Sequence, residues 1–157
     1  MGKKIIIGAD PLGVALKDAV KVHLLEKGHA VEDIGGFVDQ EVAYYRVGEE
    51  VGRRISSGEF DLGFIFCGTG MGVNIVANKF PGVYCGLCES VMSARLCRII
   101  NNCNVLSMGG LFHGKYKALE MVDAFLDAEF TQGFTEASPE FLQDAFEQVQ
   151  KFEKNLR

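Results

Sequence analysis

The sequence predicts an α/β fold, a five-stranded parallel sheet with helices on both faces. Short apolar runs alternate five times with longer segments whose apolar residues recur at helical spacing. The run Leu62–Cys67 is apolar without a break, which is typical of a parallel strand buried on both faces. Because each intervening helix returns the chain across the sheet, consecutive strands run in the same direction.

The expected elements follow one another in strict alternation. We place strands at Lys4–Ala9, Ala30–Ile34, Leu62–Cys67, Val83–Leu87 and Asn104–Met108. We place helices at Val14–Lys27, Val42–Ser57, Gly72–Asn78, Ser90–Ile100, His113–Glu129 and Pro139–Asn155. Glycines 28 and 58 directly follow two of these helices and suit their C-terminal caps. No linker or repeat interrupts the pattern, so we expect one domain over residues 1–157, with the strand order 2-1-3-4-5.

The last expected helix has strong start signals and a large apolar face. Ser138 suits the N-cap and Pro139 the first helical position. The apolar face consists of Phe141, Leu142, Phe146, Val149 and Phe152. This helix either packs on its own sheet or is exchanged with a partner subunit. We favour partner contact and interpret residues 139–156 as an oligomerisation element.

Composition excludes several classes of protein. The chain has 19 glycines but only 3 prolines among 157 residues, which indicates tight turns rather than a disordered tail. The formal net charge is −5 with no stripe rich in lysine or arginine, so we expect no nucleic-acid partner. No apolar run reaches the roughly 18 residues of a membrane span, and the N-terminus lacks the apolar stretch of a signal peptide. We therefore expect a soluble cytoplasmic protein without a membrane partner.

Four of the five cysteines are expected to be small buried hydrophobic residues. They are Cys85, Cys88, Cys97 and Cys103. Cys85 and Cys88 form a C-x-x-C pair, but strand alternation places them on opposite faces, which is a poor geometry for chelating a metal. An odd number of cysteines without a secretory signal also argues against a disulfide framework.

The strongest motif is the segment Cys67–Gly72, of sequence Cys-Gly-Thr-Gly-Met-Gly. It follows a buried strand and opens a helix, and its alternating glycines allow a sharp turn that exposes backbone N–H groups. Such amides favour an anion or a developing oxyanion. The spacing is that of neither the dinucleotide-binding motif nor the P-loop, so a nucleotide-binding module is the weakest functional hypothesis.

Cys67 and Asp10 are the side chains expected at this motif. Cys67 stands before a helix N-terminus, a position that favours the thiolate. It suits proton abstraction beside a carbonyl or covalent attack, and a packed strand-end cysteine is the structural alternative. Asp10 follows the first strand into the same crevice and is alternatively a turn or N-cap residue. Of the three histidines, only His113 lies at the same end of the sheet.

Several segments together resemble the family of ribose-5-phosphate isomerase B and galactose-6-phosphate isomerase. The matching segments are Gly8-Ala9-Asp10 with Gly13, Cys67–Gly72, Ala77-Asn78-Lys79, Ser93-Ala94-Arg95, Asn101 and Asn104-Val105-Leu106. The resemblance covers residues 4 to about 130. It implies a Rossmann-like or flavodoxin-like sheet, a dimer or tetramer with sites at the subunit interface, and no metal or cofactor.

The resemblance also implies a reaction and a set of site residues. The family interconverts an aldose phosphate and a ketose phosphate through an enediolate, so Cys67 would move the proton between C1 and C2. Thr69 and the backbone of Gly68, Gly70, Met71 and Gly72 would hold the enediolate oxygens. Asp10, Tyr44 and Asn101 would bind sugar hydroxyls, with Asn101 supplied by the partner chain. On the spacing alone, Asn101 is equally a turn residue at the opposite end of the sheet.

The sequence departs from the family where phosphate is bound and the sugar ring is opened. Pro11 and Ile100 replace two histidines, and Leu111 stands near an expected arginine. Phe134 and Ser138 lie near the places of two further arginines.

Two explanations fit these departures. A four-carbon substrate forms no ring that includes its phosphorylated carbon, so it needs no ring-opening histidine. Alternatively, the chain is a half-site or non-catalytic sugar-phosphate-binding subunit that requires a related histidine-bearing partner. Candidate replacements for the phosphate ligands are Arg46, Lys115 and Lys117, each of which is also typical of a surface charge. The leading hypothesis is a sugar-phosphate isomerase acting on a pentose, hexose or tetrose phosphate.

Overall fold

The computed structural model describes residues 2–37 and 39–156, and its centre is a sheet of five strands paired in parallel. The strands are β1 (Lys4–Ala9), β2 (Ala30–Asp33), β3 (Leu62–Cys67), β4 (Cys85–Leu87) and β5 (Val105–Gly109). β1 and β3 have the bounds that the sequence predicts, and the other three lie within two residues of theirs. The predicted fold class is confirmed.

The order of the strands differs from the expected 2-1-3-4-5 at one edge. The sheet runs β2-β1-β3-β5-β4, so β5 lies between β3 and β4. All five residues of β5 are buried, which requires a neighbour on each side. β4 has only three residues, and Leu87 is exposed. A short, half-covered strand suits the edge of a sheet, whereas a fully buried run suits its interior.

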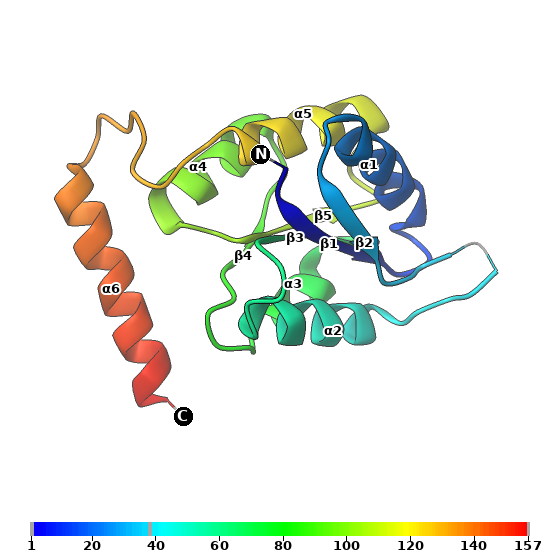
Figure 1. Cartoon of the computed structure of the whole chain (residues 1–157), viewed down its shortest axis with the longest axis horizontal. Coiled ribbons are helices and arrows are strands. Elements are labelled where there is room, and N and C mark those ends of the chain that lie inside the picture. The colour runs from blue at the N-terminus through cyan, green and yellow to red at the C-terminus, as the bar shows by residue number, and fades with distance from the viewer. Residues whose placement is uncertain (1, 38, 157) are drawn as a thin grey trace.

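Helices cover both faces of the sheet (Figure 1). They are α1 (Val14–Glu26), α2 (Tyr44–Ser56), α3 (Met71–Ala77), α4 (Val91–Asn101), α5 (Lys115–Leu126) and α6 (Pro139–Asn155). α1, α4 and α5 lie on one face, and α2 and α3 on the other. The helix expected from residue 113 begins two residues later, because Gly114 is still extended and serves as the N-cap. It also ends three residues earlier than predicted, at Leu126.

The two faces of the sheet carry separate apolar cores. Ile5 and Ile7 of β1 pack on the side of α1, α4 and α5, while Ile6 packs on the side of α2 and α3. All three are fully buried, as expected for a strand covered on both faces. Cys88 belongs to the first core and Cys85 to the second, which confirms that the C-x-x-C pair is split between the faces.

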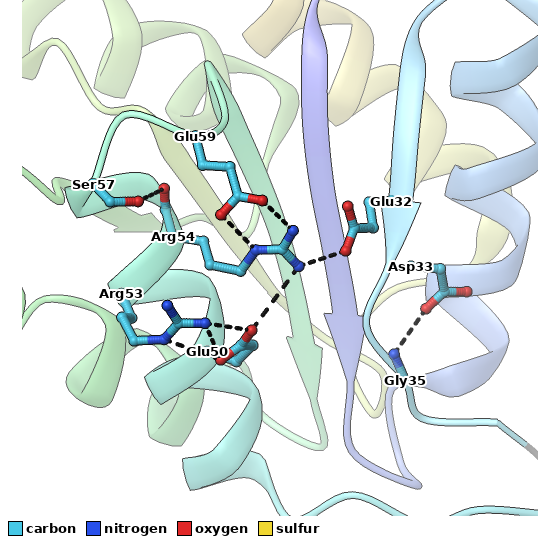
Figure 2. Close-up of polar contacts among 8 residues, drawn as sticks. All are labelled: Glu32, Asp33, Gly35, Glu50, Arg53, Arg54, Ser57 and Glu59. Atoms are coloured by element: carbon cyan, nitrogen blue, oxygen red, sulfur yellow. Dashed lines mark hydrogen bonds and ion pairs between the residues drawn. The ribbon is translucent and has the colours of Figure 1, made fainter.

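A charged network joins α2 to the edge strand β2 at the amino end of the sheet. Figure 2 shows the guanidinium group of Arg54 between the carboxylates of Glu32 on β2 and Glu59 beyond α2. Glu50 lies 3.9 Å from the same guanidinium group. Since the Arg54 side chain is only 13% exposed, these contacts fix the end of α2 against the sheet.

α6 lies outside the layered body (Figure 1) and contacts it through a few side chains. Leu142 is buried, and the ring of Phe146 packs edge-on against Tyr84 at a centroid distance of 4.9 Å. A neighbouring stripe of the helix is exposed, with Phe141 62% exposed and Phe152 64% exposed. The helix therefore packs on its own body and still presents an apolar face, and contact with a partner stays a prediction.

The described residues form neither a membrane-spanning helix nor a cluster of metal ligands. None of the helices in residues 2–37 and 39–156 is long and apolar enough to cross a membrane. Among the same residues, no group of three or more histidine, cysteine, aspartate or glutamate side chains is arranged to hold a metal ion.

Candidate active site

The carboxyl ends of β1 and β3 bring Asp10 and Cys67 together. Ala9 pairs with Phe66 in the sheet register, so the next residue of each strand is Asp10 and Cys67. The amide of Asp10 donates to the Phe66 carbonyl at 3.1 Å and continues the ladder. The two candidate residues, 57 positions apart in the sequence, are therefore neighbours at one edge of the sheet, as the sequence analysis expected.

Cys67 sits at the base of the glycine loop. Its side chain points to the face of α2 and α3, the cysteine is only 5% exposed, and its Sγ accepts a hydrogen bond from the Gly70 amide at 3.1 Å. An N–H group directed at sulfur stabilises a thiolate more than a thiol. The geometry thus supplies a cysteine whose ionised form has a built-in donor.

Gly70 adopts a conformation that requires glycine. Its φ of 76° lies in the left-handed region. A Cβ at this position would come within 2.8 Å of Leu87 Cδ1 and 2.9 Å of the Met108 carbonyl carbon. The loop therefore packs directly against β4 and β5, and no larger residue fits.

Two hydrogen bonds order the rest of the loop. The Met71 amide donates to Thr69 Oγ1 at 3.2 Å, and the Leu111 amide donates to the Gly68 carbonyl at 2.9 Å. The loop is thereby tied to the turn that follows β5. Thr69 remains half-buried beside Cys67, where the sequence analysis expected a hydroxyl for the substrate oxygens.

Asp10 forms a local turn with the backbone that follows it. Oδ1 accepts hydrogen bonds from the amides of Leu12 at 2.9 Å and Gly13 at 3.1 Å. Burial raises the pKa of Asp10, and these two amides act in the opposite direction. Gly13, rather than Asp10, is the N-cap of α1, so the turn alternative is correct and the cap alternative is wrong.

Tyr44 reaches the loop from α2. It is the first residue of that helix, is 43% exposed, and places its ring against Gly72 at the start of α3. A Cβ on Gly72 would come within 2.6 Å of Tyr44 Cδ2. The structure thus brings together Tyr44 and the glycine loop, as the resemblance implies.

Asn101 lies at the other end of the sheet. It is the last residue of α4, the helix that carries the chain from the end of β4 back to the start of β5. It lines a cavity of about 640 Å³ enclosed by β4, α4 and α6 rather than the glycine loop. Within one chain Asn101 is therefore separate from Cys67, and its role in substrate binding stays a prediction about the assembled protein.

Leucines line one side of the glycine loop, and the candidate cations are exposed to solvent. A Cβ on Gly68 would meet Leu12 Cδ1 at 2.8 Å and Leu111 Cδ1 at 3.4 Å, so leucines line that side. Arg46 is exposed and forms an ion pair with Glu49 at 2.7 Å. Lys115 and Lys117 are exposed in the first turn of α5, which begins at the same edge of the sheet.

Two further buried polar residues lie at this edge: Ser107, which the sequence analysis missed, and His113, which it noted as the histidine at this end of the sheet. Ser107 is fully buried in β5, and its hydroxyl donates to the Gly70 carbonyl. His113 is 6% exposed, and neither ring nitrogen meets the geometry of a hydrogen bond within the described residues. The available signal for Ser107 was a polar residue inside an otherwise apolar strand.

Comparisons with known proteins agree with this geometry. A sequence profile of the ribose/galactose isomerase family matches residues 5–140. Over 154 residues the chain is 40% identical to 4-deoxy-4-sulfo-D-erythrose isomerase of Clostridium sp. (strain MSTE9), a match covering 98% of this chain and 97% of that protein. It is 38% identical to ribose-5-phosphate isomerase B of Escherichia coli (strain K12) over 131 residues, 83% and 88% of the two chains.

A solved structure extends the similarity to three dimensions. Ribose-5-phosphate isomerase B of Clostridium thermocellum matches with a TM-score of 0.89 at 34% identity, and the match covers 98% of this chain and 99% of that one. The coverage includes α6 as well as the layered body. The chain belongs to the ribose/galactose isomerase family and is an isomerase.

Proposed function

We propose that this protein interconverts the aldose and ketose forms of a four-carbon sugar that carries an anionic group on C4. The proposal depends on the position of Cys67 at the end of β3. Its Sγ accepts a hydrogen bond from the Gly70 amide, and the residue lies beside Asp10. A thiolate held by an N–H donor is suited to removing a proton from the carbon next to a carbonyl. The glycine loop supplies donors for the oxyanion that then forms.

The chemistry follows from this placement. Cys67 takes the proton from C2 of the aldose, the C–H electron pair becomes the C1–C2 double bond, and O1 becomes an oxyanion. Cys67 then returns the proton to C1, while the hydroxyl proton of O2 moves to O1 and leaves a carbonyl at C2. Thr69 and the amides of Gly68 and Gly72 hold the two oxygens, which lowers the energy of the enediolate, while the Gly70 amide stays directed at Cys67 Sγ. Asp10 and Tyr44 bind the remaining hydroxyl groups.

The four-carbon substrate explains the absence of the family's ring-opening histidine. A furanose ring on a four-carbon aldose requires a free hydroxyl on C4. When C4 carries a phosphate ester or a sulfonate, that hydroxyl is absent and the sugar stays open. No ring-opening acid is then needed, which fits Ile100 in place of a histidine. The name of the relative that matches along nearly the whole chain supports the same substrate length.

The leucine-lined side of the loop favours a sulfonate over a phosphate on C4. A phosphate monoester carries about −1.5 to −2 charges near pH 7 because its second pKa is about 6. A sulfonate carries a single charge over the whole physiological range. Leu12 and Leu111 line the side of the loop at Gly68, and the candidate cations Lys115 and Lys117 are exposed to solvent. A sulfonate, with its single negative charge, requires fewer cationic side chains for binding at such a site than a phosphate does.

We also propose that the working enzyme is a dimer or tetramer in which Asn101 reaches the glycine loop of a partner. A homo-oligomer is the arrangement we favour. The second candidate is a hetero-oligomer in which this chain supplies Cys67 and a related subunit supplies a histidine, and Ile100 is the observation that favours it.

The test uses the purified chain with three substrates: 4-deoxy-4-sulfo-D-erythrose, D-erythrose 4-phosphate and D-ribose 5-phosphate. Isomerisation is followed by NMR in D2O, where deuterium at C1 of the ketose reports proton transfer by the enzyme. We expect both four-carbon substrates to react, the sulfonate with the highest kcat/KM. Cys67→Ala is expected to abolish turnover, and Cys67→Ser is expected to retain a low residual activity.

Three outcomes would contradict parts of the proposal. Preferred turnover of ribose 5-phosphate would exclude the four-carbon assignment. Undiminished activity in Cys67→Ala would exclude the cysteine as the base. Activity that requires a related histidine-bearing subunit would select the hetero-oligomer over the homo-oligomer.

A further inference from the structure

Ser107 occupies a position where packing alone predicts an apolar residue. It lies in the middle of β5, is fully buried, and pairs in register with Ile65 of β3 and Leu87 of β4. Val105, two residues earlier, packs in the core on the side of α2 and α3, so Ser107 faces the side that carries Cys67. A buried hydroxyl lowers stability unless it is hydrogen-bonded, so its partner indicates why it is there.

The partner of Ser107 is the Gly70 carbonyl, 37 positions earlier in the chain. The same oxygen accepts the Asn74 amide at 3.3 Å, the first hydrogen bond of α3. Gly70 therefore has its carbonyl anchored to β5 and its amide directed at Cys67 Sγ at 3.1 Å. Because glycine has the widest choice of backbone conformations, the direction of that amide depends on what holds the residue.

We propose that Ser107 is a positioning residue that keeps the Gly70 amide directed at the Cys67 thiolate. Its hydroxyl fixes the carbonyl side of Gly70, and the left-handed conformation of the glycine then aims the N–H at sulfur. Donors fixed before the reaction stabilise charge without reorganising during it. Ser107 does not touch the substrate, and the inference rests on the proposed function, in which the reacting group is this thiolate.

The first readout is independent of turnover. Tryptic cleavage after Arg54 and Lys79 yields a peptide whose single cysteine is Cys67, so the rate of alkylation by iodoacetamide at fixed pH can be followed at that residue by mass spectrometry. In Ser107→Ala we expect this alkylation rate to fall by roughly three- to tenfold, the scale of one altered hydrogen bond to a charged group. The second readout is isomerisation, where we expect kcat to fall about tenfold with KM within about twofold.

A matched control removes another hydroxyl that donates to a backbone carbonyl. Ser57 Oγ donates to the Arg54 carbonyl at 3.0 Å at the amino end of the sheet (Figure 2), and Ser57→Ala should change neither readout. If Ser107→Ala does not fold, Ser107→Cys, which has a similar volume and a weaker donor, should give a smaller fall in the alkylation rate. An unchanged alkylation rate in a folded Ser107 variant would overturn the inference. Because alkylation needs no substrate, failure of the proposed reaction is distinguishable from failure of this role.

Discussion

The ring of Tyr44 lies against Gly72, so that the first turn of α2 closes over the first turn of α3. This contact is the link between the glycine loop and a side chain that the sequence places 28 positions away. It depends on the absence of a side chain at Gly72, because a Cβ there would come within 2.6 Å of Tyr44 Cδ2. The site therefore depends on glycine for close approach as well as for turns.

Gly72→Ala is expected to displace Tyr44 and lower kcat/KM about tenfold, mainly through KM. An alanine in an open helix would instead stabilise the protein by up to about 1 kcal/mol. The measurement pairs steady-state kinetics with thermal unfolding. Tyr44→Phe keeps the ring in place and removes only the hydroxyl, so it separates packing from hydrogen bonding. Wild-type kinetics in Gly72→Ala would mean that Tyr44 has no part in binding.

Lys17 and Asp33 form an ion pair of 2.7 Å between side chains that are 0% and 5% exposed. Burial alone would raise the pKa of Asp33, but hydrogen bonds from Lys17, the Gly35 amide and Lys21 outweigh it and lower the pKa. Breaking such a pair leaves a buried charge. We expect Lys17→Met to lower the free energy of unfolding by about 3 kcal/mol, measured with urea at pH 7.

The pH dependence has a definite sign. Because the folded-state pKa of Asp33 lies below its usual 3.8, its ion pair stabilises the fold above that pH and ceases to do so as the pH falls through the lowered value. The difference between Lys17→Met and the wild type should therefore shrink in strong acid. Lys21→Met is the control, since the Lys21 side chain is 35% exposed and should cost under about 1 kcal/mol. A loss in Lys17→Met that is constant with pH would contradict the ion-pair explanation.

His113 should make the protein sensitive to mild acid. Burial lowers its pKa below 6.5, and the charge of Lys117 acts in the same direction. Below pH 6.5 the unfolded chain therefore binds a proton that the folded one does not, and stability falls as the pH drops towards the folded-state value. We expect His113→Leu to flatten this part of the curve of unfolding free energy against pH. Parallel curves for the variant and the wild type between pH 5 and 7 would be the contrary result.

The exposed stripe of α6 should govern assembly. Phe141 and Phe152 face solvent, while Leu142 and Phe146 hold the helix to its own chain. The double variant Phe141→Ser/Phe152→Ser is expected to reduce the mass measured by light scattering and, if Asn101 acts on the partner's site as proposed, the isomerase activity as well. Gln148→Ser on the same helix serves as the control. An unchanged mass would place the subunit interface elsewhere.

The sequence alone determined the layered fold class, nearly every element and the segment that forms the candidate site. These features depend on local patterns, since apolar periodicity, glycine position and caps act within a few residues along the chain. From these patterns the sequence analysis predicted Cys67, Thr69 and Asp10 at one edge of the sheet, and the structure places all three there.

Only the tertiary structure decided which strand lies inside the sheet and what supports the loop. The exchange of β4 and β5 depends on which run can be covered on both sides, which no local pattern states. The contacts of Ser107 with Gly70 and of Tyr44 with Gly72 join residues 37 and 28 positions apart. These contacts form only after the sheet has brought the residues together. They therefore depend on the packing of the folded chain and cannot be recognised from the local sequence pattern.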